Sequence, residues 1–144
     1  MPPNSTFRVD LVDALYDLLV VYQTANPTLL RKVYRTRPAA FQELPSAFVG
    51  PREESITHTS GTRERTIAPS VVVVDTFSDN IETGDRMDIL IDDLVDVFTA
   101  GVSQVPTSII EPTAVIPGEL EASGAIYRAE SIQFGRTTIR EGRS

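Results

Sequence analysis

The sequence contains no cysteine and no tryptophan, and it has one histidine and one lysine. Without thiols the chain can form neither a disulfide framework nor a thiolate metal site, so cysteine usage says nothing about the redox compartment. Residues 1–20 lack the cationic start and the unbroken apolar core of a secretory signal peptide. Apolar runs stay far below the roughly 20 residues that a membrane-spanning helix requires. We therefore expect a soluble protein without an export signal.

Motifs for catalysis are also missing. The sequence has no HExxH, no GxSxG and no Ser-His-Asp order. Gly84 is not followed by lysine, which excludes a phosphate-binding P-loop. His58 stands in a polar stretch without the companions that a metal site or a general base needs, so we interpret it as an ordinary surface residue. We expect no catalytic residue, no metal and no cofactor, and hence a protein that is not an enzyme.

Acidic residues outnumber basic ones by 20 to 13, which gives a net charge of −7. This balance argues against a protein that wraps nucleic acid, because such a protein needs a basic surface to displace counterions. The length of 144 residues and the hydrophobic content of 41% suit one globular domain. We expect this domain to cover residues 1–144, with a charged tail over residues 135–144 that a partner can order.

The segment Val71–Phe98 is the strongest pattern in the chain. Four valines in succession (Val71–Val74) predict a strand that is covered on both faces, because β-branched side chains suit a packed, pleated surface. Asp79 and Glu82 form a capping-box pattern at the start of a helix. A stripe of apolar residues at helical spacing follows: Met87, Leu90, Ile91, Leu94, Val95 and Phe98.

A first helix is expected from Ser5 to about Tyr22, because apolar residues recur at helical spacing until the break near Pro27. Additional valines make this helix apolar on more than one face: Val9, Val12, Val20 and Val21. Two interpretations remain open. Either the helix is enclosed in the core, or it also contacts a neighbouring subunit.

Short strands are expected next, at Val33–Arg35 and Ala47–Val49, with Glu53–Thr57 continuing the second after a bend. His58–Gly61 is interpreted as a hairpin turn, because Ser-Gly supplies turn chemistry. A longer strand follows over Thr62–Asp75. Pro69 interrupts it, which implies an edge position or a bulge.

The C-terminal third predicts two further strands. The first spans Thr107–Ile116 and is weakened by Pro112, and the second spans Ala125–Thr138. Between them Pro117-Gly118 indicates a turn. The resulting fold class is α+β, with a mixed, mostly antiparallel sheet of about four to five strands packed with two main helices.

Acidic and basic residues are concentrated in different parts of the sequence. The second helix carries aspartates on one face, which is either a solvated face or a contact for arginines of another subunit. Arginines cluster around the hairpin and near the C-terminus, and arginine suits directional pairing with carboxylates across interfaces. Separate acidic and basic surfaces favour self-association, as a ring if the rotation closes. The residues expected at the subunit or partner interface are Arg52, Arg63, Arg65, Asp85, Asp88, Asp92, Asp96, Arg136 and Arg140.

The order of these patterns resembles the tail terminator (tail completion, neck) proteins of long-tailed bacteriophages. The resemblance spans roughly Phe7 to Ile139. It rests on Val33–Pro38, Ala47–Gly50 and Arg63–Thr66, and its strongest part is the block Val71–Asp88. These are hydrophobic and capping patterns rather than catalytic signatures.

The resemblance implies a structural virion protein that forms a hexameric ring at the head-proximal end of the tail tube. Its partners would be the tail tube protein and the head-closure or connector proteins. Genomic DNA would pass through the lumen without sequence-specific binding. Three alternatives stay open: a head-closure or tube protein of related fold, a small ligand-binding or enzymatic domain, and a dimeric interaction module of the toxin–antitoxin type.

Overall fold

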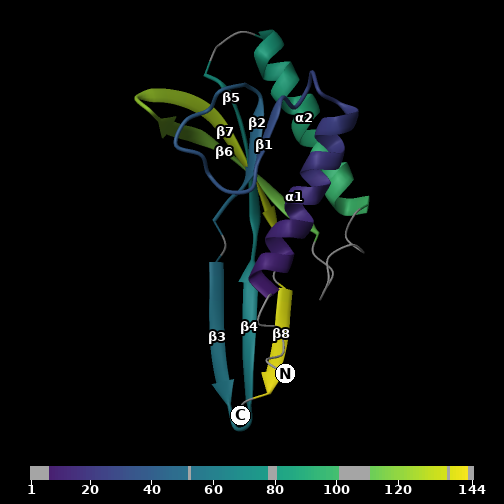
Figure 1. The fold of residues 1–144 in the computed structure, drawn as a ribbon, viewed down its shortest axis with the longest axis vertical. Helices are drawn as coiled ribbons and strands as arrows, with labels where there is room; N and C mark the ends of the chain where they lie inside the picture. The colour runs from purple at the N-terminus through teal and green to yellow at the C-terminus, as the bar shows by residue number, and fades with distance from the viewer. Residues whose placement is uncertain (1–6, 52, 78–80, 101–110, 136, 143–144) are drawn as a thin grey trace.

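The computed structural model describes residues 7–51, 53–77, 81–100, 111–135 and 137–142 (Figure 1). Two helices and two sheets make up this part of the chain. The elements in chain order are α1 (Phe7–Ala25), β1 (Lys32–Tyr34), β2 (Ser46–Val49), β3 (Glu53–Thr59), β4 (Thr62–Ala68), β5 (Ser70–Thr76), α2 (Ile81–Ala100), β6 (Pro112–Ala122), β7 (Ala125–Phe134) and β8 (Thr137–Gly142).

The strands form a body sheet and an arm. The body sheet has five strands in the order β1-β2-β5-β7-β6, and both helices cover one of its faces. Its β1–β2 pair is parallel and its other pairs are antiparallel. The arm is the three-stranded sheet β3-β4-β8, which projects away from the body (Figure 1). The predicted α+β class, with a mixed, mostly antiparallel sheet and two helices, is confirmed.

Strand β5 lies at the centre of the body sheet, between β2 and β7. Its four valines are all buried, with 0–8% of each side chain exposed. Val71 and Val73 pack against the helices, whereas Val72 and Val74 pack on the opposite face. The predicted coverage on both faces is confirmed, because a continuous apolar run leaves neither face suited to water.

The helices pack their apolar stripes on the body sheet as predicted. In α2 the buried side chains are those of Met87, Leu90, Ile91, Leu94 and Phe98. Helix α1 runs to Ala25, three residues beyond its predicted end. Its Val9 and Val21 are exposed at 51% and 65%, so α1 is not enclosed on all sides. The predicted contact of α1 with a neighbouring subunit stays a prediction. The expected start of the first helix at Ser5 and the expected cap at Asp79 lie outside the described residues.

A loop over residues 35–45 covers part of the face of the body sheet that lies opposite the helices, here called the second face. Its Phe41 ring packs against Phe48 of β2 and Tyr127 of β7, at centroid distances of 6.1 and 5.2 Å. Hydrogen bonds tie the loop to the β6–β7 hairpin, including one of 2.7 Å from Arg37 Nη2 to the Glu121 carbonyl. The loop therefore connects the β1–β2 side of the body sheet with the β6–β7 side.

The predicted single strand Thr62–Asp75 is wrong in one respect: it forms β4 of the arm and β5 of the body. Pro69 lies between the two strands, neither at an edge position nor in a bulge. Its carbonyl accepts a hydrogen bond of 3.1 Å from Phe134 N. A proline fits this crossing because the position needs no N–H donor. The predicted strand Ala125–Thr138 divides in the same way, into β7 and β8.

The predicted turn at Pro117-Gly118 is also wrong. Strand β6 continues through it, and Pro117 lies opposite Glu130 of β7. Proline is tolerated there because β6 is an edge strand of the body sheet. The chain turns at Ser123-Gly124, where both residues have positive φ, 52° and 80°. Residues 107–110 of the predicted preceding strand lie outside the described residues.

The predicted hairpin turn at Ser60-Gly61 is confirmed between β3 and β4. Gly61 has a φ of 78°, a conformation that favours glycine. His58 belongs to β3 rather than to the turn, and Glu53–Thr57 is part of this arm strand rather than a continuation of β2.

Gly50 marks the point where the chain leaves the body for the arm. A methyl group added there would lie 2.7 Å from Ser70 Oγ and 2.8 Å from Val72 Cγ2. We expect Gly50→Ala to lower the free energy of unfolding by about 1–3 kcal/mol, because the buried surroundings must shift to admit it. Urea denaturation measures the loss. Gly118→Ala is the matched control, since its nearest neighbour outside the strand is 3.8 Å away; equal losses in the two variants would contradict the crowding argument.

Candidate assembly surface

The four aspartates predicted from helical spacing lie on the outer face of α2. Asp85, Asp88, Asp92 and Asp96 are all exposed. Within the described part of the chain, Asp85, Asp92 and Asp96 form no ion pair. Like charges one helical turn apart repel by a few tenths of a kcal/mol per pair. A basic partner would relieve this repulsion.

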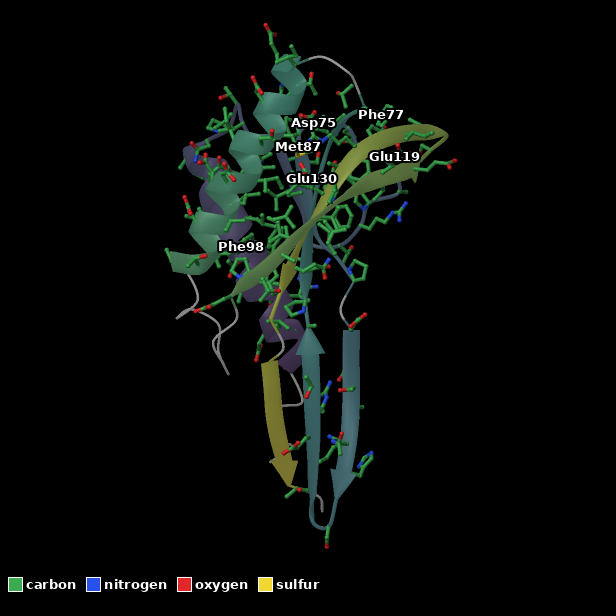
Figure 2. All side chains as sticks on the ribbon, turned by 180° about the vertical axis from the view of Figure 1, so that it is seen from behind. Asp75, Phe77, Met87, Phe98, Glu119 and Glu130 are labelled. Carbon is green, nitrogen blue, oxygen red and sulfur yellow. The ribbon has the colours of Figure 1, made fainter. Side chains whose placement is uncertain are left out.

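Asp88 differs from the other three because it contacts the body sheet. Arg128 of β7 lies between two carboxylates, with Nη2 3.4 Å from Asp88 Oδ1 and 3.2 Å from Glu130 Oε2. Glu130 is only 8% exposed and lies on the sheet beneath α2 (Figure 2). Burial raises the pKa of the Glu130 carboxyl, the Asp88 charge adds to this, and the Arg128 charge opposes it.

The raised pKa of Glu130 gives a pH dependence of stability. Folded Glu130 binds its proton more tightly than the unfolded side chain, whose pKa is 4.5. The stability from this group is therefore fully present below pH 4.5 and is lost as the pH rises through the folded pKa. We expect Glu130→Gln to remove this loss and to flatten the dependence of unfolding free energy on pH above 4.5. Urea titrations across this range measure it. The control is Glu119→Gln at an exposed position of β6; an unchanged slope in Glu130→Gln would refute the assignment.

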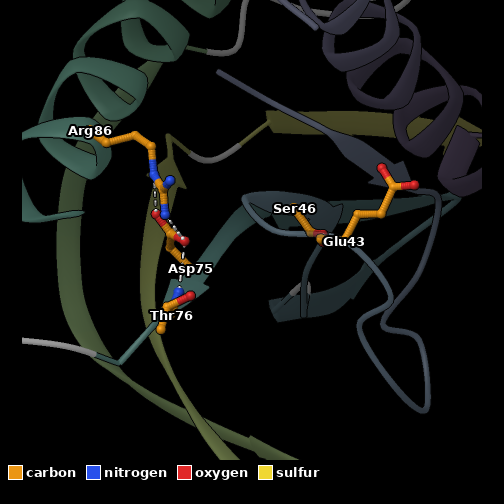
Figure 3. A network of polar contacts seen from close by, with 5 residues as sticks. All are labelled: Glu43, Ser46, Asp75, Thr76 and Arg86. Carbon is orange, nitrogen blue, oxygen red and sulfur yellow. Dashed lines mark hydrogen bonds and ion pairs between the residues drawn. The ribbon is translucent and has the colours of Figure 1, made fainter. Parts of the chain in front are cut away.

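The start of α2 is fixed to β5 by an ion pair between a buried carboxylate and Arg86, whose side chain is 38% exposed. The Asp75 carboxylate is fully buried and accepts hydrogen bonds of 2.9 and 2.7 Å from Arg86 Nε and Nη2 (Figure 3). It also accepts one of 2.7 Å from Thr76 N. The two-pronged geometry sets the position of the first turns of α2 on the sheet.

Another polar contact joins α1 to α2. The Tyr22 hydroxyl donates a hydrogen bond of 2.7 Å to Asp93 Oδ2. Burial and, after it, the Asp93 carboxylate raise the pKa of Tyr22. The phenol therefore remains a donor at physiological pH and holds Asp93 inward, unlike the exposed aspartates beside it.

The arm contains part of the predicted arginine cluster. Arg65 of β4 donates hydrogen bonds of 2.8 and 2.7 Å to Glu54 Oε1 of β3, and both side chains are largely buried. Arg63 lies opposite His58 of β3 and Glu141 of β8. Arg140 lies in β8 opposite Glu64. Arg52 and Arg136 lie outside the described residues. The topology thus brings the hairpin and the C-terminal segment into one sheet.

Charge differs in sign between the arm and the rest of the chain. Residues 51–68 and 135–144, which contain the arm strands, carry six arginines and four glutamates. The remaining residues carry seven basic and sixteen acidic side chains. The arm segments are therefore weakly basic, and the body with its helical layer is strongly acidic.

A groove with a volume of about 510 Å³ lies on the second face of the body sheet, beside the loop over residues 35–45. Residues of β2, β5, β6 and β7 line it, and Arg37 and Glu119 are the charged residues among them. The apolar residues that line it are Phe48, Val49, Pro51, Val72, Ile116, Pro117, Leu120 and Ala129. Sequence reasoning missed this groove, because its walls come from segments far apart in the chain.

The described residues contain no group of three or more side chains that would hold a metal ion. None of the described helices is long and apolar enough to cross a membrane. His58 is exposed on β3. The surface features that stand out are the acidic face of α2 and the projecting arm.

Comparison with known proteins reveals a likeness of fold. No family model matches the chain, and no curated protein is similar to it. A chain in the solved virion of a native gene transfer agent (GTA) particle matches with a TM-score of 0.56 and 12% sequence identity. The match covers 88% of this chain and 92% of that chain. At this identity the likeness shows that the two chains share a fold over most of their length.

Proposed function

We propose that the protein is a structural component of a phage-like virion, and specifically a tail terminator. It would form a ring that caps the head-proximal end of the tail tube and joins it to the neck. The observation that carries this proposal is the shared fold with a chain of a gene transfer agent virion, over 88% and 92% of the two chains. The sequence resemblance to tail terminators supports the same role independently.

A non-enzymatic role is supported by the distribution of polar groups. The buried carboxylate of Asp75 is paired with Arg86 of α2, and that of Glu130 is paired with Arg128 of the same strand, so both are occupied by structural ion pairs. The 510 Å³ groove is lined mainly by apolar side chains. A catalytic pocket would bring several polar groups together in a concave site.

The separation of charge supports self-association. The acidic face of α2 and the weakly basic arm are different surfaces, so contact between them is heterologous. Heterologous contacts produce a ring when the rotation closes. In the proposed ring, Asp85, Asp88, Asp92 and Asp96 of one copy lie near arginines of the next copy's arm. These are Arg52, Arg63, Arg136 and Arg140, together with Arg65, which is already paired with Glu54 within its own arm.

The ring would act by interface complementarity. One face fits the last ring of the tail tube protein, and the opposite face fits the head-closure or connector proteins. Because the opposite face does not match another tube ring, tube growth stops. The acidic balance suits a passage for DNA, since negative charge does not retain phosphates. The protein would then reside in the virion, in the tail–neck region.

Light scattering across concentration and salt tests the ring. We expect a hexamer, or a monomer that closes into hexamers as concentration rises. High salt should dissociate it, because the Debye length falls from about 10 Å at 0.1 M to about 3 Å at 1 M. Open-ended polymers would instead indicate a tube protein, and a stable dimer at every condition would contradict the terminator role.

Neutralising the acidic face provides a sharper test. We expect Asp92→Asn/Asp96→Asn to raise the concentration needed for assembly about tenfold, which corresponds to about 1.4 kcal/mol. The isolated fold should be no less stable, because repulsion along α2 is relieved. The control Asp17→Asn/Glu119→Gln removes two exposed acids from other elements. Equal shifts in both variants would argue against a specific acidic interface.

A further inference from the structure

The groove beside the loop over residues 35–45 is formed where small residues lie among larger ones. Residues two apart in a strand share a face, so Ile116, Gly118 and Leu120 of β6 line it together. Gly118 lies opposite Ala129 of β7, which belongs to the apolar cluster of this face. Gly118 has no side chain and Ala129 has only a methyl group, whereas Ile116 and Leu120 are large. A large apolar side chain from outside would therefore fit between them.

The second face of the body sheet has less cover than the other face. Both helices pack on the other face, whereas the loop over residues 35–45 covers the second face in part. Ile116, which lines the groove, is 53% exposed, and Gly118 is exposed as well. An apolar sheet face is normally buried against a further layer of secondary structure. We expect a partner to supply that layer here.

The backbone of the sheet limits what can occupy the groove. Strands β2, β5 and β7 each pair with a strand on both sides, so their N–H and C=O groups are used within the sheet. The outer strand β6 contains Pro117, which has no N–H to donate. An occupant would find few backbone partners, and an unpaired buried N–H or C=O group is costly. An α-helix meets this condition, because it satisfies its own backbone hydrogen bonds.

The width of the sheet sets the length of such a helix. Residues of β2, β5, β7 and β6 line the groove, so it spans three strand spacings. At about 4.8 Å each, these spacings amount to about 14 Å. A helix rises about 1.5 Å per residue, so about ten residues would cross the groove. Apolar side chains at i, i+3, i+4 and i+7 of this helix would face the sheet.

Arg37 places a positive charge at the groove. Its side chain is exposed, and among the residues that the structure describes it forms no ion pair. Its Nη2 donates a hydrogen bond to the Glu121 carbonyl, which holds the side chain at the β6 end of the groove. A guanidinium has five N–H donors, so most of them remain available for a carboxylate.

Glu119 also lines the groove but does not neutralise Arg37. It lies between Gly118 and Leu120 in β6, and successive side chains of a strand point to opposite faces. Its cross-strand partner Arg128 contacts Asp88 of α2, which identifies their face as the one that the helices cover. The acceptor for Arg37 must therefore come from the occupant.

We propose that the groove binds an amphipathic helix of a partner protein, with a large apolar side chain over Gly118 and Ala129 and an acidic side chain paired with Arg37. This inference goes beyond the ring, because the groove lies on the face of the body sheet away from α2 and its aspartates. The partner helix would complete a three-layer arrangement in which both faces of the body sheet are covered. Pairing with Arg37 would set the direction of the helix across the strands.

A displayed library of helical peptides tests the proposal. The peptides have about 15 residues, because shorter helices are marginal in water. They carry apolar residues at i, i+3, i+4 and i+7, and the remaining positions are varied. We expect selection against the full chain to enrich peptides with an aspartate or glutamate at one end of the apolar face. Fluorescence polarisation of the selected peptides then gives their Kd.

Two variants of the groove connect this binding to its geometry. Gly118→Leu fills the space, and the atom nearest to the added Cβ is 3.8 Å away, so the fold should tolerate it. We expect its Kd to rise at least about tenfold. Arg37→Glu should also raise Kd about tenfold, and replacing the acidic residue of the peptide by lysine should restore binding to this variant. The matched control is Thr57→Leu, which adds the same side chain at an exposed position of β3 and should leave Kd unchanged.

The other outcomes separate this proposal from the ring. No enriched peptide, or peptides that bind Gly118→Leu as tightly as the unmodified chain, would overturn the helix site. Failure of the lysine peptide to rescue Arg37→Glu would overturn the pairing with Arg37. Gly118→Leu should form the same ring in light scattering; loss of the ring would show that a neighbouring copy covers the groove and would overturn the partner helix. Peptide binding by a protein that stays monomeric at every concentration would overturn the ring alone.

Discussion

Arg86→Met is expected to lower the free energy of unfolding by about 3–5 kcal/mol, because it leaves a buried carboxylate without its counter-charge. Asp75 has 0% of its surface exposed and receives two hydrogen bonds from Arg86. After the substitution only the Thr76 N–H remains among the hydrogen bonds of this network. The first turns of α2 should also pack less firmly on β5. Chemical denaturation measures the loss.

Two further variants test the cause. Arg35→Met removes an ion pair with Asp13 whose side chains are 46% and 50% exposed. We expect a loss of only about 0–1 kcal/mol there, because water screens exposed pairs. The double variant Asp75→Asn/Arg86→Met should recover part of the loss, since no buried charge remains uncompensated. Equal losses for Arg86→Met and Arg35→Met would contradict the buried-charge argument.

Phe98→Ala is expected to cost about 3–5 kcal/mol, because it opens a cavity in the core. Phe98 is 1% exposed and lies at the C-terminal end of α2, where its ring meets Phe134 of β7 edge to face at 5.0 Å (Figure 2). This pair joins the helical layer to the end of the body sheet that leads into the arm. Thermal or urea unfolding measures the effect.

Phe77→Ala is the control for the same chemical change at the surface. Phe77 is 56% exposed at the end of β5, so its truncation should alter stability by about 0.5 kcal/mol or less. A loss of similar size in both variants would indicate that the packing of Phe98 against Phe134 is not the cause. The Phe77→Ala variant also tests assembly separately from folding. An exposed aromatic side chain suits a partner contact, and its removal leaves the stability of the fold nearly unchanged.

Local patterns predicted the centre of the fold. The valine run and the apolar stripe after it specify a buried strand and an amphipathic helix, because side-chain periodicity depends only on neighbouring residues. The same periodicity placed Asp85, Asp88, Asp92 and Asp96 on the exposed face of α2. Their role in assembly remains a prediction. Turn chemistry located the Ser60-Gly61 hairpin for the same local reason.

Sheet membership could not be predicted from the sequence. Pro69 and Gly135 separate strands that belong to different sheets, yet a break in a strand pattern does not say whether the chain bends, bulges or crosses. Pro117-Gly118 contains turn residues, but the edge position of β6 lets a proline remain within a strand. Pairing between distant segments decides these cases.

Thus the sequence by itself determined the α+β class, the two helices with their buried and acidic faces, the central strand and the first hairpin, because these depend on local periodicity and turn chemistry. Tertiary structure alone decided the division into body and arm, the burial of Asp75 and Glu130, and the apolar groove. Each of these depends on which distant segments lie side by side.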